Sequence, residues 1–258
     1  MRKAIILVLL TLPCLVWGQS PVAMHSHNDY ERTVPFFEAY SQHCVSIEAD
    51  VYLQDGEILV AHDRKDVRAD RSLKTMYIEP IVRIFRENGG RMWRGSDDRL
   101  DLVIDLKTAE SMPGVVALFE QYPDVFASGN GVRVLIGGEK PAAEDFDKWP
   151  SWLWFIGRFE QGKLNFTPDQ LSRIAVISAR FRDFAKTWNG KGRMDDSDFS
   201  AVRRAIEDAH RAGKPIRFWG APDTGNVYLT FYVMGADIIN TDDPARCRMF
   251  FEERLKVN

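Results

Sequence analysis

The sequence has few cysteines, no excess of basic residues and, beyond its first residues, no long hydrophobic run. Only three of its 258 residues are cysteine, which excludes a small fold held together by a disulfide framework. The 34 Lys and Arg are outnumbered by 37 Asp and Glu, so the chain lacks the electrostatic footprint of a nucleic-acid-binding protein. No later segment has the roughly 20 apolar residues of a transmembrane helix, and nothing implies a partner protein.

The first residues form the one strongly apolar segment. Two basic residues precede an apolar run over 4–12 that continues to Trp17, a pattern typical of a secretory signal peptide. Gly18 is small enough to precede the cleavage site. We therefore expect residues 1–18 to be removed and the mature protein, 19–258, to be exported to the periplasm or secreted. Loss of the two basic residues changes the formal net charge from −3 to −5.

Three cysteines bear on the compartment. Cys14 lies in the leader directly after Pro13, which disfavours the alternative of a lipoprotein anchor. Cys44 and Cys247 remain after cleavage, and an oxidising compartment would permit them to pair. One precedes an expected strand and the other lies in an expected terminal helix, positions that more often bury single thiols. We therefore expect free, buried cysteines.

Short runs of β-branched and apolar residues alternate with amphipathic stretches along the mature chain. Such alternation indicates a parallel sheet, and eight repeats indicate closure into a single (β/α)₈ (TIM) barrel domain. An open doubly wound sheet is the alternative, but no glycine-rich phosphate loop follows the first run. The expected strands are Val22–His27, Val45–Leu53, Leu100–Lys107, Val132–Ile136, Leu153–Phe159, Ile174–Ser178, Ile216–Trp219 and Asp237–Asn240. The expected helices include Val34–Gln42, Ile78–Glu87, Phe199–Arg211, Val227–Met234 and Pro244–Lys256.

The second expected strand is followed at once by a turn and a further extended run. Asp55-Gly56 lies between Val45–Leu53 and Glu57–Ala61, and Asp-Gly between two extended runs indicates a β-hairpin. This small insertion is expected to bring the chain back and to place His62 near the end of the second strand.

Acidic side chains share one face of the second and third expected strands. Alternate residues of a strand point the same way, so Glu48 and Asp50 project together, as do Asp105 and Lys107. Three converging carboxylates repel one another, and an oxygen-seeking divalent cation is the usual compensation. We expect one Ca²⁺ or Mg²⁺ here, because barrel active sites lie at the carboxyl ends of the strands. The alternative is a set of solvated strand ends or ion pairs with Lys107.

Two histidines follow expected strands at the same end of the barrel. His27 ends the first strand and His62 ends the hairpin. Cleavage of a phosphodiester by an internal hydroxyl needs a base for the nucleophile and an acid for the leaving oxygen, and histidine serves both purposes near neutral pH. The pair beside three carboxylates and a lysine indicates proton-transfer chemistry.

Several motifs together resemble the phospholipase C-like phosphodiesterase superfamily, which includes glycerophosphodiester phosphodiesterases and phosphoinositide phospholipases C. The matching segments span nearly all of the mature chain. They are His27-Asn28-Asp29-Tyr30, Ser46 to Val51, Asp55-Gly56 with Val60 to Asp63, Ile104 to Lys107, and Gly235 to Pro244. The resemblance implies a (β/α)₈ barrel that hydrolyses glycerophosphodiester- or phosphoinositide-like substrates.

The resemblance also implies residue roles. His27 would be the general base, His62 the general acid, and Lys107 would face the phosphate. The implied cation ligands are Glu48, Asp50, Asp105 and Asn28. Two of these depart from the glycerophosphodiesterase pattern. Asn28 stands where those enzymes usually have Arg and is similar to the metal-binding Asn of eukaryotic phospholipases C, and Asp105 replaces the more usual Glu. The alcohol on the phosphodiester is therefore left open.

Four further residues lie near expected strand ends and are candidates for lining the substrate pocket. They are Arg217 and Trp219 on the seventh strand, Glu139 after the fourth and Arg158 in the fifth. The alternative for these residues is a set of rim charges and a packed aromatic ring.

Three other functions were weighed. His25-Ser26-His27 matches the His-x-His of metal-dependent amidohydrolases, but those barrels also need histidines on the fifth and sixth strands, where this chain has none. A glycosidase could use Glu48 and Asp50 as paired carboxylates, yet it gives the two histidines no role. A non-catalytic headgroup-binding barrel would bind its ligand tightly without turnover.

Overall fold

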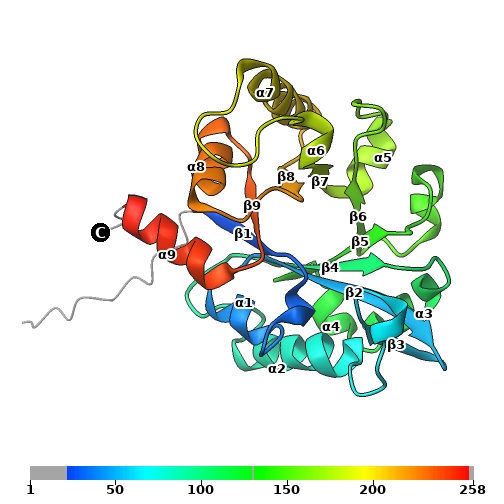
Figure 1. Ribbon diagram of the computed structural model, residues 1–258. Helices are drawn as coiled ribbons and strands as arrows, with labels where there is room; N and C mark the ends of the chain where they lie inside the picture. Colours follow the sequence, from blue (N-terminus) through cyan, green and yellow to red (C-terminus); the bar gives the residue numbers. More distant parts are fainter. Residues whose placement is uncertain (1–21, 130, 256–258) are drawn as a thin grey trace, which may run out of the picture.

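The computed structural model describes residues 22–129 and 131–255, so the expected signal peptide at 1–18 lies outside the described residues. Within the described part, eight parallel strands form a closed barrel in the order β1, β9, β8, β7, β6, β5, β4, β2, and β1 pairs with β2 to close it (Figure 1). The TIM barrel predicted from strand-helix alternation is thereby confirmed. The barrel strands are β1 (Ala23–Ser26), β2 (Ser46–Gln54), β4 (Leu100–Leu106), β5 (Val132–Gly138), β6 (Leu153–Gly157), β7 (Ile174–Arg180), β8 (Ile216–Trp219) and β9 (Ile238–Thr241).

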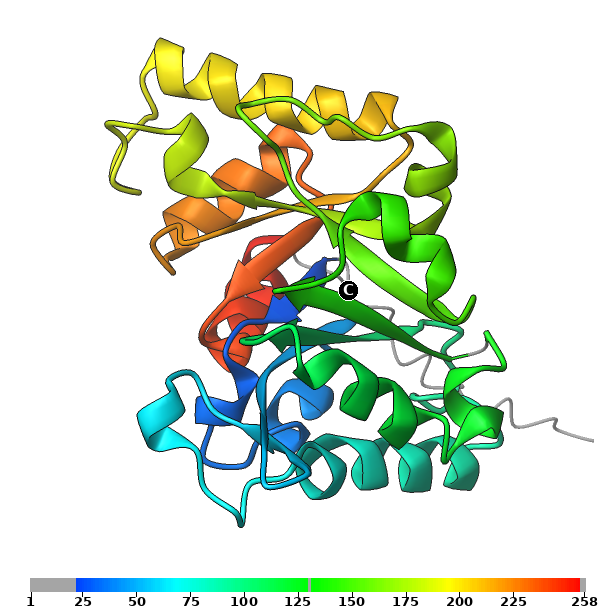
Figure 2. The ribbon, with the colours of Figure 1, turned by 90° about the vertical axis from the view of Figure 1, so that its right-hand side faces the viewer.

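Helices cover the outside of the strands, as two perpendicular views show (Figures 1 and 2). They include α1 (Phe37–Ser41), α2 (Glu79–Glu87), α3 (Ser111–Phe119), α4 (Pro123–Phe126), α5 (Pro168–Arg173), α6 (Phe181–Phe184), α7 (Asp196–Arg211), α8 (Gly225–Met234) and α9 (Pro244–Leu255). Short 3₁₀ segments are η1 (Asp29–Glu31), η2 (Arg64–Asp66) and η4 (Ala143–Lys148), and a π-helical turn, η3 (Lys74–Ile78), precedes α2.

Strand alternation separates two hydrophobic cores. Ile47, Ala49 and Val51 on β2 belong to the large cluster between the barrel and its helices. A smaller cluster, which includes Val103 of β4 and Leu135 of β5, takes the inward-facing positions of neighbouring strands. These apolar side chains fill the barrel interior, so polar side chains gather only near its two ends.

The hairpin predicted after the second strand is present. β3 (Glu57–Val60) runs antiparallel to β2, and Gln54 pairs with Glu57. Asp55 and Gly56 have φ of 52° and 83°, as a two-residue turn between twisted strands requires. The hairpin returns the chain so that the Ala61 amide donates to the Asp50 carbonyl at 3.1 Å, which brings His62 beside the end of β2.

Two further expectations concern the described residues. Cys44 and Cys247 are both buried free thiols, as their positions predicted. None of the helices in residues 22–129 and 131–255 is long and apolar enough to cross a membrane.

Candidate active site

A cavity opens at the carboxyl ends of the barrel strands and contains most of the predicted site residues. Val103 and Ile156, from the barrel core, form part of its floor. Its other lining residues are His27, Asn28, Glu48, Asp50, His62, Asp105, Lys107, Gly137, Arg158, Ser178, Arg217 and Trp219. Glu139 is not among them: it is exposed and follows Gly138, whose φ of 66° turns the chain so that the Glu139 amide donates to the Leu106 carbonyl.

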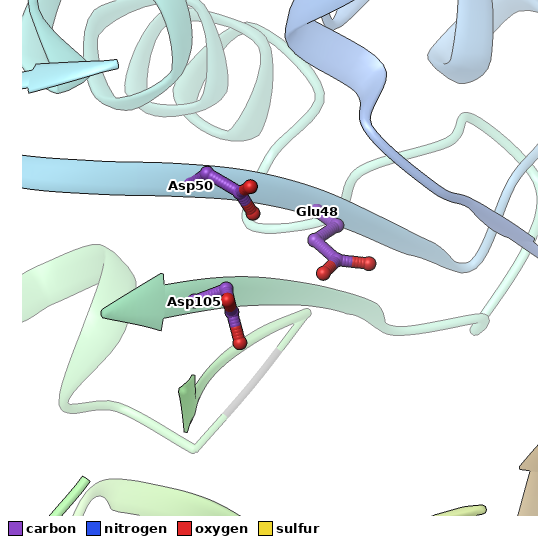
Figure 3. A group of neighbouring side chains, drawn as sticks. All are labelled: Glu48, Asp50 and Asp105. Atoms are coloured by element: carbon purple, nitrogen blue, oxygen red, sulfur yellow. The ribbon is translucent and has the colours of Figure 1, made fainter. Parts of the chain in front are cut away.

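Three carboxylates converge in this cavity. Glu48 and Asp50 project from β2 and Asp105 from the adjacent β4 (Figure 3). One oxygen of each lies within 4.8 Å of the others. Glu48 and Asp50 are buried and Asp105 is partly buried, so their mutual repulsion is poorly screened by water.

The two carboxylate oxygens of Asp50 have different surroundings. Its Oδ2 accepts from the Tyr30 hydroxyl at 2.7 Å and lies 2.6 Å from Lys107 Nζ and 3.0 Å from His62 Nδ1. Its Oδ1 is buried without any hydrogen-bond partner among the described residues. A buried carboxylate oxygen without a partner is costly. Burial and the charge of Glu48 raise the pKa of Asp50, although Lys107 opposes them.

Glu48 is fixed from inside the barrel. His25, fully buried on β1, lies with Nε2 2.7 Å from Glu48 Oε2 and with Nδ1 2.7 Å from Ser46 Oγ. Arg217 NH2 is 3.7 Å from the same Glu48 oxygen. Burial and the charge of Arg217 lower the pKa of His25 to about 3, so His25 is neutral and donates. Burial opposes the ionisation of Glu48, but His25 and Arg217 outweigh it and lower the pKa of Glu48.

Asp105 pairs with Lys107 two residues on. Lys107 Nζ is 2.8 Å from Asp105 Oδ2, and Arg158 NH2 is 3.7 Å from Asp105 Oδ1. Gly137 of β5 leaves room for this carboxylate, because a Cβ at that position would lie 3.0 Å from Asp105 Oδ1. Lys107 therefore bridges the Oδ2 atoms of Asp50 and Asp105 and leaves their Oδ1 atoms to the cavity.

His27 makes a hydrogen bond between the end of β1 and the end of β9. Its Nδ1 lies 2.8 Å from Asp242 Oδ1, just after β9. Burial opposes protonation, but the Asp242 hydrogen bond and the charge of Glu48 raise the pKa of His27. The same contact lowers the pKa of Asp242. With Nδ1 occupied, Nε2 of His27 is the nitrogen left for the cavity.

His62 lines the cavity beside the end of β2. Its Nδ1 lies 3.0 Å from Asp50 Oδ2 and 3.1 Å from the Tyr30 hydroxyl. The Tyr30 hydroxyl also lies 2.8 Å from Asn28 Oδ1. Asn28 has a left-handed backbone, with φ of 46°, a conformation that Asn tolerates better than most residues. Tyr30 thus joins Asn28, Asp50 and His62 in one network.

Three residues of the site were not assigned these roles from the sequence: Tyr30, Asp242 and His25. Tyr30 and Asp242 lie within the quoted motifs, so their place in the chain was visible, but their contacts link segments far apart in sequence. His25 was considered only as half of a His-x-His pair. Its inward position on β1, opposite Ser46 in the register, was the available signal.

The donor set fits a divalent cation. All converging groups offer oxygen, the ligand atom that Ca²⁺ and Mg²⁺ prefer, and the partnerless Asp50 Oδ1 is an atom that such an ion would satisfy. Glu48, Asp50 and Asp105 would hold it, with Asn28 at the cavity wall beside them.

Comparison with known proteins finds a phosphodiesterase family model that matches part of this chain. Residues 15–127 match a family model described as the AIM6-like phosphodiesterase domain. Altered inheritance of mitochondria protein 6 homolog of Arthroderma benhamiae is 24% identical over 91% of this chain and 85% of its own length. Altered inheritance of mitochondria protein 6 of Eremothecium gossypii is 27% identical over 88% of this chain and 71% of its own.

Solved structures share the fold. A glycerophosphodiester phosphodiesterase from Parabacteroides distasonis superposes with a TM-score of 0.56 at 13% identity, covering 92% of this chain and 100% of that one. A phosphodiesterase of Oleispira antarctica, solved with the product sn-glycerol-3-phosphate, gives a TM-score of 0.53 at 13% identity over 90% of this chain and 96% of that one. The resemblance to phospholipase C-like phosphodiesterases inferred from the motifs is confirmed.

Proposed function

We propose that this protein is a metal-dependent phosphoric diester hydrolase that acts on glycerophosphodiester- or phosphoinositide-like substrates. One observation carries the proposal. Three carboxylates converge in a cavity that two histidines also line, and each histidine has its Nδ1 beside an aspartate, Asp242 for His27 and Asp50 for His62. Each Nε2 is then left for a substrate, which is the arrangement that an acid and base pair needs.

The residues divide the proposed chemistry among them. His27 takes the proton of the attacking hydroxyl through Nε2 while Asp242 fixes the ring and stabilises its positive charge. The substrate's own hydroxyl is already near phosphorus, so proximity lowers the entropic part of the barrier. His62 gives a proton to the departing oxygen, and water then opens the cyclic phosphate. Lys107 and Arg217 offset negative charge on the phosphoryl oxygens. A bound Ca²⁺ or Mg²⁺ would supply further charge stabilisation.

The proposed substrate class rests on the chemistry of side chains that line the cavity. Arg158 and Trp219 line the cavity mouth, and Arg180 stacks on Trp219 with its guanidinium carbon 5.8 Å from the ring centroid. A cationic and aromatic rim of this kind suits a polar alcohol such as glycerol or inositol. The Oleispira antarctica relative in fold was solved with sn-glycerol-3-phosphate, which supports the same class of substrate.

A substrate panel tests the proposal. Protein stripped with chelator is assayed on glycerophosphodiesters, phosphoinositides and cyclic phosphodiesters, before and after Mg²⁺ or Ca²⁺ is returned. We expect turnover only with the cation, and Glu48→Gln and Asp50→Asn to lose it while remaining folded. The matched control is Glu207→Gln, an exposed carboxylate of α7 paired with Arg203. Full activity of Asp50→Asn, or turnover of p-nitrophenyl glycosides without metal, would overturn the assignment.

We also propose that the protein is exported after cleavage following Gly18. Protein isolated from its native host should begin at Gln19, with or without cyclisation to pyroglutamate. Mass spectrometry of the N-terminal peptide checks this, and an intact Met1 terminus in the cytoplasm would contradict it.

A further inference from the structure

The inner oxygen of Glu48 is engaged by a group that no proposed catalytic step uses. His25 is completely buried on β1, beneath the cavity, and its Nε2 lies 2.7 Å from Glu48 Oε2. Ser46 Oγ lies 2.7 Å from the other ring nitrogen. In the β1 and β2 register His25 stands opposite Ser46, two residues before Glu48 on the same face. The imidazole is therefore held at both nitrogens, and Ser46 donating to Nδ1 sets the tautomer in which Nε2–H donates to Glu48.

This contact fixes which oxygen of Glu48 the cavity receives. Oε2 accepts from His25 and lies 3.7 Å from Arg217 NH2, so Oε1 is the Glu48 oxygen that no hydrogen bond within the described residues holds. Asp50 and Asp105 are divided in the same way, because Lys107 contacts the Oδ2 atom of each. All three carboxylates therefore offer one oxygen each, from directions set by His25 and Lys107.

One-oxygen donors distinguish between the two candidate cations. Mg²⁺ demands near-octahedral geometry and keeps several waters, whereas Ca²⁺ takes six to eight oxygens and readily accepts two from one carboxylate.

We propose that His25 is a positioning residue that makes Glu48 a one-oxygen ligand of fixed direction and biases the site toward Mg²⁺ over Ca²⁺. The inference rests on the proposed function, since it assumes that the carboxylates bind a cation. His25 itself touches neither cation nor substrate.

Calorimetric titration of chelator-stripped protein with MgCl₂ and with CaCl₂ alone tests this without any assay of turnover. His25→Leu removes the donor at similar volume, and outer partners of metal ligands are typically worth about 10–100-fold in affinity. We expect His25→Leu to weaken Mg²⁺ binding by roughly that factor. Ca²⁺ binding should weaken less, because a released Glu48 can offer both oxygens, so the ratio of the Ca²⁺ to the Mg²⁺ Kd should fall about tenfold.

Two further variants make the test decisive. In His25→Gln the side-chain amide can donate from the position of Nε2, so this variant should retain the wild-type ratio. Ser46→Ala keeps the imidazole but frees its other nitrogen, and it should shift the ratio in the same direction as His25→Leu by a smaller factor. It serves as the test if His25→Leu does not fold.

The outcomes separate the two proposals. One outcome is that His25→Leu, or Ser46→Ala in its place, folds and keeps the wild-type ratio of the Ca²⁺ to the Mg²⁺ Kd, whether or not both Kd values rise. The positioning role is then wrong and the proposed function stands. If wild-type protein binds neither cation, both the positioning role and the metal dependence of the proposed function fall.

Discussion

Each of the two cavity histidines has its Nδ1 beside an aspartate, but the two aspartates have different surroundings. Asp242, the partner of His27, is not one of the three converging carboxylates. Asp50, the partner of His62, is one of them and is an expected cation ligand. Loss of His62 therefore removes a proton donor and one partner of an expected cation ligand, while loss of His27 removes a base and the partner of Asp242, which is not among the converging carboxylates. The two substitutions are distinguishable by the leaving group of the substrate.

The first prediction concerns that difference. His27→Ala should lose about 10²–10⁴-fold in kcat/KM on every substrate, the usual cost of removing a general base. His62→Ala should lose a similar factor on esters with alkoxide leaving groups but recover much of it on a p-nitrophenyl phosphodiester, whose leaving group needs no proton. Steady-state kinetics on both substrate types measure this. Equal losses for His62→Ala on the two would exclude it as the acid.

The second prediction concerns the space beside Asp105. In Gly137→Ala the new Cβ would lie 3.0 Å from Asp105 Oδ1, so the carboxylate must shift by a few tenths of an ångström. A site that depends on placement within about 0.5 Å should then lose roughly tenfold in activity while the fold is retained. Gly114→Ala is the control, since its Cβ would crowd only the end of the Ile58 side chain. Equal activity of both variants would show that Asp105 tolerates the shift.

At the scale of elements, the strands were predictable because a buried parallel strand reads as a short apolar run between breaks. β2, predicted as Val45–Leu53, spans Ser46–Gln54, and β8 matches its predicted bounds. The site residues on these strands followed from alternation alone. Helix α7 was predicted to begin at Phe199 but begins at Asp196, because polar capping residues, invisible to a search for apolar periodicity, supply its first turn.

Asp198 in that first turn ties α7 to the preceding loop. Its carboxylate accepts from the backbone amides of Lys186, Thr187 and Trp188 at 2.8–2.9 Å. Burial alone would raise the pKa of Asp198, but these hydrogen bonds outweigh it and lower the pKa to about 2. The ionised side chain therefore stabilises the folded state at neutral pH.

The third prediction follows from these bonds. Asp198→Asn should lower the free energy of unfolding by about 1–3 kcal/mol, because Asn keeps only one acceptor oxygen and turns an NH₂ group toward backbone amides that the other carboxylate oxygen accepted from. Since the folded-state pKa lies below the ordinary value of 3.8, the stabilisation is complete above about pH 4 and is lost as the pH falls toward 2. The difference between variant and wild type in urea melts should shrink over that range. Asp196→Asn is the control, because Asp196 is exposed and lies two residues before Asp198. A difference in unfolding free energy between Asp198→Asn and wild type that does not change with pH would contradict the prediction.

At the scale of the whole molecule, contacts that join distant segments were the part that sequence reasoning missed. Tyr30 bonds to groups on β2 and after β3, and Asp242 bonds to His27 across 215 positions. Periodicity reports which way a side chain points from its own strand, and it carries no information about what lies opposite. The distances between strand ends become known only when the barrel closes.

The fourth prediction concerns the stability of the whole barrel. A cation that binds only the folded protein at about 100 times its Kd stabilises it by about 2.7 kcal/mol. For a domain of this size that raises Tm by roughly 5–10 °C. Differential scanning calorimetry of chelated protein with added Mg²⁺ or Ca²⁺ measures the rise, which Glu48→Gln should abolish and Glu207→Gln should not. Identical Tm values with and without millimolar cation would contradict a metal site.

The pairing of β1 with β9 means that the surroundings of His27 are completed by the last part of the chain to be synthesised. Every expected cation ligand lies between Asn28 and Asp105, in the part of the chain made first, but the partner of His27 follows the last strand, and the His27 amide itself donates to the Thr241 carbonyl at 3.0 Å. A nascent chain made only as far as β8 thus has its carboxylates but no completed base. On the proposed mechanism the final strand completes the catalytic base, so a chain that lacks β9 is expected to be inert toward phosphodiesters.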